Sequence, residues 1–190
     1  WKHRRQRQMC IRDRFNSLCL VLGVSFLVAI IGVTTAWLVT FFNFSGKKIF
    51  QWALILPLAV PPYLLAYVFT EFFDYSGTAN NFLRNLLNAE SDIVFSPNIR
   101  TIYGAIAVFS FTLYPYVYMV ARVAFMNISP SLIEASKLLG KNSISTFFCL
   151  LIPLIRPAII AGIALVAMET LSDFGAVQHF AIPTFTTGIF

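Results

Sequence analysis

The chain has 190 residues, of which 58% are hydrophobic and only 12% are charged. A typical soluble domain carries about 25% charged residues, so this composition excludes a disordered chain and argues against a soluble globule. Its 20 Phe residues would also be hard to bury in a globule of this size. A membrane protein is therefore the expected class.

The net charge of +6 is concentrated at the N-terminus: residues 1–14 carry six Lys or Arg against Asp13, while the rest is nearly balanced. These residues lack the apolar periodicity of a helix, and they resemble translated adapter or vector sequence. We expect a non-native tail here, the alternative being a true basic arm in the cytoplasm. Because the basic character belongs to the tail, it does not indicate a nucleic-acid partner.

Four apolar stretches are each about long enough to cross a bilayer, which takes about 20 helical residues. They cover residues 17–40, 49–70, 101–121 and 153–171. Lipid cannot hydrogen-bond a bare backbone, so each is expected to be a helix, with its internal prolines tolerated as kinks. The predicted fold class is an all-α, polytopic membrane helix bundle with about four transmembrane helices.

The connections between these stretches differ in charge. Residues 41–48 carry Lys47 and Lys48, and residues 122–156 carry four basic residues against one acid, whereas acids outnumber basic residues in 71–100. The positive-inside rule places the first and third connections in the cytoplasm and the second outside. The basic tail would then lie on the outer side, where it is disfavoured, so we leave it out of the fold.

The third connection contains a loop, about 127–153, that is too apolar for a simple linker. Ser129 and Pro130 are typical of a helix start, and Gly140 is typical of a left-handed cap at its end. A second helix is expected from about Ser143. The first helix is either an interfacial helix on the headgroups or a docking helix for a cytoplasmic partner. Its predicted apolar face contains Leu132, Ile133, Ala135, Leu138 and Leu139, and its polar face Glu134, Ser136 and Lys137.

The loop carries a spaced pattern of small, acidic and aliphatic residues. It reads Glu134-Ala135-Ser136, three residues, Gly140, nine residues, and then Leu150, Leu151, Ile152 and Pro153. This resembles the EAA loop of permease subunits of ABC importers, E-A-A, three residues, G, nine residues, I, any residue, L, P. Ser136 replaces the second Ala, Leu150 the Ile and Ile152 the Leu.

Other stretches resemble the permease subunits of ferric-iron ABC importers: residues 42–77, 111–125 and 168–190. In that family the permease has two fused halves, each with its own EAA loop. The chain resembles most of the first half, with a partial type-1 permease domain over 15–190. It starts at Trp1 rather than Met, and we expect it to be a piece of a longer protein.

The resemblance implies a transport subunit of the bacterial inner membrane rather than an enzyme. The helix around Glu134 would be the coupling helix in a groove of a cytoplasmic ATP-binding subunit, with Glu134 paired to a basic residue there and Gly140 permitting the turn. A periplasmic iron-binding protein would deliver ferric iron, and a second permease half would complete the pathway. The chain has no GxxxxGK[ST] motif, so ATP is expected to be used by the partner and no cofactor by this chain.

Two acids near the end of the fourth stretch are candidates for the translocation pathway. Glu169 lies 16 residues past Pro153, about 24 Å along a straight helix. It either faces the pathway or reaches interfacial water, and Asp173 falls beyond it, toward the outer side. Together with His179 they do not form a cluster with ligand spacing, and neither a metal site nor a catalytic residue is assigned.

Two further functions remain open on the sequence alone. One is the same machine with another cargo, such as thiamine, sulfate or molybdate. The other is a passive channel or a membrane-embedded enzyme. An enzyme requires clustered catalytic residues, which the sequence pattern does not show, and a channel would not need an ATP-hydrolysing partner.

Overall fold

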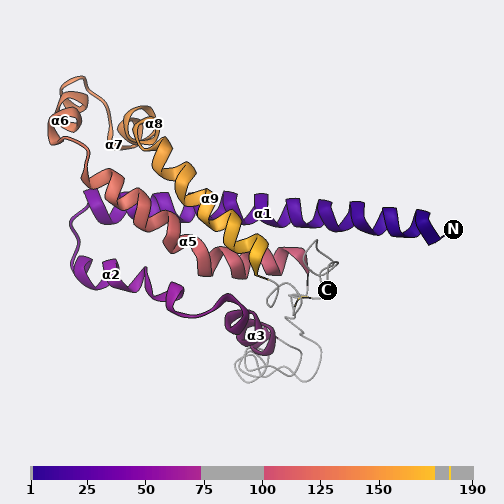
Figure 1. The fold of residues 1–190 in the computed structure, drawn as a ribbon. Helices are drawn as coiled ribbons and strands as arrows, with labels where there is room; N and C mark the ends of the chain where they lie inside the picture. Colours follow the sequence, from indigo (N-terminus) through magenta and orange to yellow (C-terminus); the bar gives the residue numbers. More distant parts are fainter. Residues whose placement is uncertain (1, 74–100, 174–179, 181–190) are drawn as a thin grey trace, which may run out of the picture. The chain divides into compact units, whose positions relative to one another are not determined.

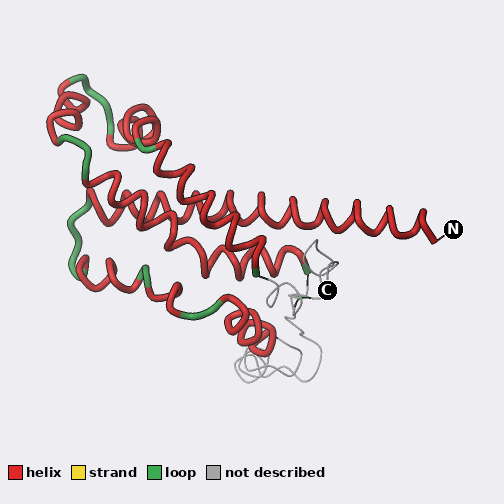
Figure 2. The backbone as a smooth tube through the Cα atoms, in the orientation of Figure 1, coloured by secondary structure: helices red, strands yellow, loops and turns green. Residues whose placement is uncertain are grey.

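The computed structural model describes residues 2–73, 101–173 and 180, with side chains of the first helix described from Asp13 onward. These parts are helices joined by short loops, and no strand occurs in them (Figures 1 and 2). The predicted all-α class is confirmed. The elements are α1 Lys2–Phe41, α2 Lys47–Ala53, η1 Leu56–Ala59, α3 Pro62–Phe73, α5 Ile102–Met126, α6 Pro130–Leu138, α7 Ser143–Thr146, the π-helical turn η2 Phe147–Leu151, α8 Ile152–Leu154 and α9 Arg156–Ser172.

Two of the predicted membrane stretches are single long helices. Asp13–Phe41 within α1 and Ile102–Met126, which is α5, are both long and apolar enough to cross a bilayer. They contain nearly all of the predicted stretches 17–40 and 101–121. Pro115 lies inside α5 without ending it, as expected where the surrounding segment can satisfy the freed carbonyl.

The second predicted stretch is broken rather than continuous, and the fourth is bent near its start. The second is divided into α2, η1 and α3, with Pro57, Pro61 and Pro62 at or near the breaks. The fourth begins at Arg156, where α9 is bent by 71° from Ser143–Leu154. Proline lacks the backbone N–H that continues a helix, which accounts for both interruptions. The described parts therefore hold two helices that could cross a membrane, or up to four if each bent pair is one span.

The basic tail is part of α1, which begins at Lys2. The described residues 2–14 are helical although they lack the apolar periodicity of a helix. Extending an existing helix costs little, and Arg, Lys, Gln and Met are good helix formers. The helix of the apolar segment therefore continues into the tail. Its non-native origin stays a prediction. Residues 74–100 of the predicted outer connection, together with His179, lie outside the described residues.

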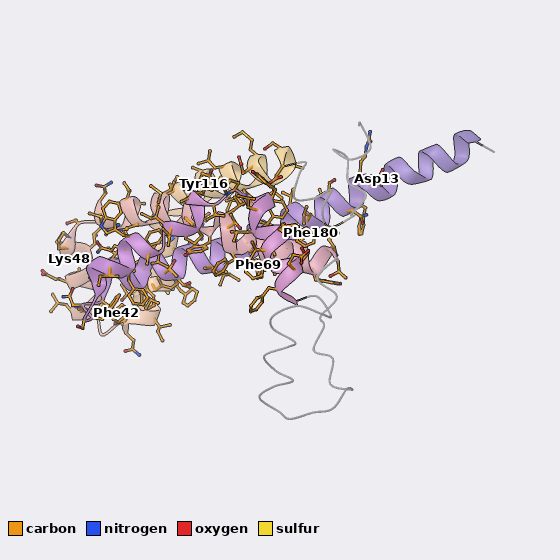
Figure 3. All side chains as sticks on the ribbon, turned by 90° about the horizontal axis from the view of Figure 1, so that it is seen from below. Asp13, Phe42, Lys48, Phe69, Tyr116 and Phe180 are labelled. Carbon is orange, nitrogen blue, oxygen red and sulfur yellow. The ribbon has the colours of Figure 1, made fainter. Side chains whose placement is uncertain are left out.

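The helices divide into two compact units. The first contains Trp1–Val24, Ala59–Thr112 and Ala167–Phe190. Within it, α1 and α5 approach so closely that a Cβ on Gly23 would lie 2.7 Å from Ile106 Cδ1. Phe69 of α3 packs edge to face on Phe111 of α5, with 6.3 Å between ring centroids (Figure 3 labels Phe69).

The second unit contains Ser25–Leu58 and Leu113–Val166, and its centre is Val117 of α5, which is fully buried. A Cβ on Gly32 of α1 would lie 2.9 Å from Val117 Cβ, and a Cβ on Gly162 of α9 would lie 3.1 Å from Val117 Cα. Three helices thus meet at one side chain because two of them present glycine to it. Small residues are the usual means of close helix packing in membranes.

Aromatic contacts join the helix ends of the second unit. The rings of Trp37 and Phe147 are 4.6 Å apart, and those of Phe41 and Phe125 are 5.6 Å apart. The C-terminal ends of α1 and α5 therefore lie together, which brings the first and third connections to one end of this unit. That agrees with the prediction that both face the same side. Figure 3 labels Phe42 and Lys48 in the first of these connections.

Gly32→Ala tests the contact at Val117. An ordinary Gly→Ala change within a helix stabilises it by about 1 kcal/mol. Here the added Cβ also meets the backbone N of Tyr118 at 3.0 Å, so we expect a net loss of about 1–3 kcal/mol, measured by denaturant unfolding of the purified protein in detergent. Ala164→Val, at an exposed position of α9, is the control and should change little. A more stable Gly32→Ala variant would contradict the close packing.

Candidate functional site

The loop with the spaced pattern begins with the predicted helix start. Ser129 is the N-cap of α6 in an extended conformation, with φ −61° and ψ 130°, and Pro130 occupies the first turn. The hydroxyls of Ser129 and Ser131 lie 2.6 Å apart. Proline fits this position because its φ is already helical and it needs no N–H partner there. The predicted start of this helix is confirmed.

Gly140 ends α6 in the left-handed conformation, with φ +74°. The Lys141 N–H donates to the Ser136 carbonyl (3.1 Å), and the Gly140 N–H donates to the Lys137 carbonyl (2.9 Å). This pair of bonds is the Schellman motif, which satisfies the last carbonyls of a helix. A Cβ at Gly140 would meet no neighbour within 4 Å, so glycine is favoured by the backbone angle alone, by about 1–2 kcal/mol. The predicted left-handed cap is confirmed.

The faces of α6 are not those predicted from the sequence. Ser136 is only 9% exposed, whereas Leu138 is 90% exposed and Leu139 is 80% exposed. Ser136 was expected on the outer, polar side, but its small side chain fits inside because its hydroxyl finds a partner there. The exposed residues of the loop helix and its C-cap, which we call the exposed stripe, are Pro130, Ser131, Leu132, Glu134, Ala135, Lys137, Leu138 and Leu139.

The partner of Ser136 is Thr146 of the next helix. Their hydroxyl oxygens are 3.0 Å apart and buried, and Ser136 Oγ also donates to the Ile133 carbonyl at 2.8 Å. Thr146 is 6% exposed. Sequence reasoning missed this contact, because a hydroxyl pair ten residues apart leaves no periodic signal. It connects the two sides of the Gly140 turn.

The second part of the pattern passes through α7, η2 and α8. Leu150 and Ile152, the two aliphatic positions of the pattern, are half-buried, while Leu151 between them is 2% exposed. Pro153 is exposed within α8, two residues before the break at Ile155. The π-helical turn at Phe147–Leu151 adds a residue to the helical repeat, and such turns accompany interrupted helices. The sequence pattern thus ends at the bend that leads into α9.

A pocket of about 130 Å³ lies in the second unit, between the end of α1 and the loop. Aromatic side chains of α1 form one wall, and Ile133 and Lys137 of α6 form part of the other. Lys137 lines this pocket and is also exposed to solvent. The lining residues are Trp37, Phe41, Phe42, Ile133, Lys137, Ser143, Thr146 and Leu151.

The two pathway candidates lie at the end of α9, in the first unit. Glu169 is half-buried, and its backbone carbonyl accepts bonds from Asp173 N–H (3.0 Å) and Ser172 Oγ (3.0 Å). Since the helix is bent before Arg156, the straight path of 24 Å from Pro153 does not exist. Glu169 lies about 20 Å from Arg156 along α9 at 1.5 Å per residue. The described residues contain no group of three His, Cys, Asp or Glu side chains that could hold a metal ion.

Comparison with known families identifies the chain. Residues 28–187 match the family described as "Binding-protein-dependent transport system inner membrane component". The chain belongs to this family. The match contains α6, the Gly140 turn and the helices that follow, so the loop described above lies within the shared domain of these transport components.

Curated relatives in this family carry different cargo names. The chain is 27% identical over 175 residues to the Fe(3+)-transport system permease protein FbpB 2 of Haemophilus influenzae, covering 92% of this chain and 30% of the relative. It is 30% identical over 167 residues to the molybdenum permease protein ModB of Escherichia coli, covering 88% and 68%. It is 28% identical over 152 residues to the sulfate permease protein CysT of Salmonella typhimurium, covering 80% and 52%.

A solved structure shares the fold. A chain from the crystal structure of a bacterial alginate ABC transporter, in complex with an alginate pentasaccharide-bound periplasmic protein, aligns with a TM-score of 0.72 and 19% identity. The alignment covers 94% of this chain and 65% of the other. The polytopic helical fold predicted from the sequence is thus that of a transporter of known structure. The chain spans between about a third and two thirds of these proteins.

Proposed function

We propose that the chain is part of the membrane-spanning permease subunit of an ATP-driven importer in the bacterial inner membrane. Its family, its long apolar helices and the printed names of its relatives support this function. In this proposal a periplasmic binding protein delivers the cargo, a second permease half completes the pathway, and ATP is hydrolysed on a separate cytoplasmic subunit.

The observation that carries the proposal is the exposed stripe of α6. Leu138 and Leu139 are almost fully exposed, although burying a leucine is worth about 1.5–3 kcal/mol. The helix has only nine residues, and the Gly140 turn and the Thr146 contact hold it in place. A short, fixed helix that presents leucines outward fits a groove on a partner protein.

Glu134 favours a protein partner over the lipid surface. It lies one helical turn before Leu138, so the acid and the leucine share the outward side of α6. The cytoplasmic leaflet is negatively charged and would repel the exposed Glu134 carboxylate. A basic residue in the groove of an ATP-binding subunit would instead form a charge-assisted hydrogen bond with Glu134.

The mechanism follows from this placement. Closure of the ATP-binding subunits would move α6, and the loop would pass this movement to α5 before it and α9 after it. The spans would then change between inward-open and outward-open states. At the far end of α9, Glu169 and Asp173 are proposed to face the pathway, where a carboxylate would favour a cation.

Ferric iron is the proposed cargo. The resemblance of residues 42–77, 111–125 and 168–190 to ferric-iron permeases supports it, as does an iron relative that aligns with 92% of the chain. Sulfate and molybdate are the alternative cargoes, since relatives named for them are about equally identical.

Leu138→Ser tests the docking of the exposed stripe in the full-length protein. The side chain is 90% exposed, so the fold should keep its stability. Losing the burial of one leucine should weaken binding of the ATP-binding subunit by about tenfold or more, measured by co-purification and titration. Ile144→Ser, which removes another exposed apolar side chain of the same loop, is the matched control. Equal binding by Leu138→Ser and wild type would rule out this docking surface.

Uptake assays test the cargo. Cells that express the full-length permease with its ATP-binding subunit should accumulate radiolabelled ferric iron, and not sulfate or molybdate. A variant of the ATP-binding subunit that cannot hydrolyse ATP should abolish uptake. Accumulation of sulfate or molybdate instead would show that this anion, and not iron, is the cargo. Uptake that survives the loss of ATP hydrolysis would indicate a passive channel.

A further inference from the structure

The hydroxyl of Ser136 makes two contacts, one with the Ile133 carbonyl and one with the Thr146 hydroxyl. Each hydroxyl carries a single hydrogen, and Ser136 Oγ uses its hydrogen to donate to the Ile133 carbonyl at 2.8 Å. We assign Thr146 Oγ1 as the donor and Ser136 Oγ as the acceptor of the 3.0 Å contact, because this gives each hydrogen its own acceptor. The three groups form a chain from Thr146 through Ser136 to the backbone of α6, in which each bond polarises the next.

This use of a threonine hydroxyl differs from that in the long helices. Thr34, Thr35 and Thr40 each donate to a carbonyl one turn earlier in their own helix. That local bond is the usual arrangement in membrane helices, and it does not connect one helix to another. Thr146 instead reaches a residue ten positions away in another helix, so its hydroxyl fixes one element to another.

The contact also lies where a mechanical connection is needed. On one side is α6, whose exposed stripe faces outward. On the other side, Thr146 is the last residue of α7 and leads directly into η2, where Phe147 packs on Trp37 of α1 at 4.6 Å. The two sides are also joined by the turn at Gly140, where a Cβ would have no neighbour within 4 Å, and residues of both sides line one pocket.

We propose that Ser136 and Thr146 are positioning residues, whose hydroxyl pair makes α6 move together with α7 and η2. This inference rests on the proposed function, since the pair would pass the movement of a docked α6 to the helices behind it. Without the pair, α6 could pivot at the Gly140 turn, and ATP hydrolysis would be spent without moving the cargo. Ser136 stands where the EAA pattern has Ala, so the hydroxyl at this position is a departure from that pattern.

The test compares single and double variants of the full-length permease in complex with its ATP-binding subunit, reconstituted in vesicles. Ser136→Ala and Thr146→Val should each lower the amount of cargo moved per ATP hydrolysed, by about fivefold to tenfold, as expected for the loss of one buried hydrogen bond. Thr146→Ser keeps the hydroxyl and should retain the wild-type ratio. Ser145→Ala, which removes the neighbouring hydroxyl of the same helix, is the matched control and should also retain it.

Amide hydrogen exchange of residues 136–146 provides a readout that does not depend on transport. Ser136→Ala leaves the buried Thr146 hydroxyl without its acceptor, whereas in Thr146→Val the Ser136 hydroxyl still donates to Ile133. Exchange should therefore rise more in Ser136→Ala than in Thr146→Val. Adding Thr146→Val to Ser136→Ala should lower exchange again, because the unpaired hydroxyl is gone.

The outcomes separate the two proposals. If Thr146→Val binds the ATP-binding subunit as wild type does but transports less cargo per ATP, the positioning role is supported. If Thr146→Val retains wild-type exchange and coupling, or if Ser145→Ala loses as much as Thr146→Val, the positioning role is overturned. If the wild-type chain does not bind an ATP-binding subunit, the proposed function fails, while the exchange order still reports whether the hydroxyl pair holds the loop.

Discussion

The meeting of α1, α5 and α9 at Val117 is the contact on which the rest of the second unit depends. Lipid tails are as apolar as leucine, so membrane helices gain little from the hydrophobic effect when they associate, and close packing must hold them. Gly32 and Gly162 provide it by letting two backbones reach the same valine. The loop follows α5 and precedes α9, and both of these helices pack at Val117. Both ends of the loop are therefore anchored at this contact.

Local signals in the sequence were sufficient for the long helices and for the ends of α6. Unbroken apolar stretches predicted α1 and α5, a Ser-Pro pair predicted the start of α6, and Gly140 predicted its left-handed end. Each of these depends on the chemistry of a few neighbouring residues. The role of Gly32 on α1 in packing against Val117 was not recognised from the sequence.

The features that sequence reasoning missed depend on distant partners. Ser136 was placed on the polar face of α6, but its side chain is buried, where its hydroxyl contacts that of Thr146. Pro57, Pro61 and Pro62 were interpreted as kinks in a continuous span, yet they lie where that stretch divides into α2, η1 and α3. A pattern of apolar residues cannot distinguish a bend from a break, because both leave the composition unchanged.

Cross-linking at Leu138 can distinguish whether α6 faces a protein, as proposed, or the lipid surface. A photoactivatable amino acid would replace Leu138 in the full-length permease, expressed in membranes with its ATP-binding subunit, and the adducts would be identified by mass spectrometry. If α6 docks on the ATP-binding subunit, we expect a covalent adduct with that subunit. Adducts with phospholipid alone, at a side chain that is 90% exposed, would show instead that α6 is an interfacial helix.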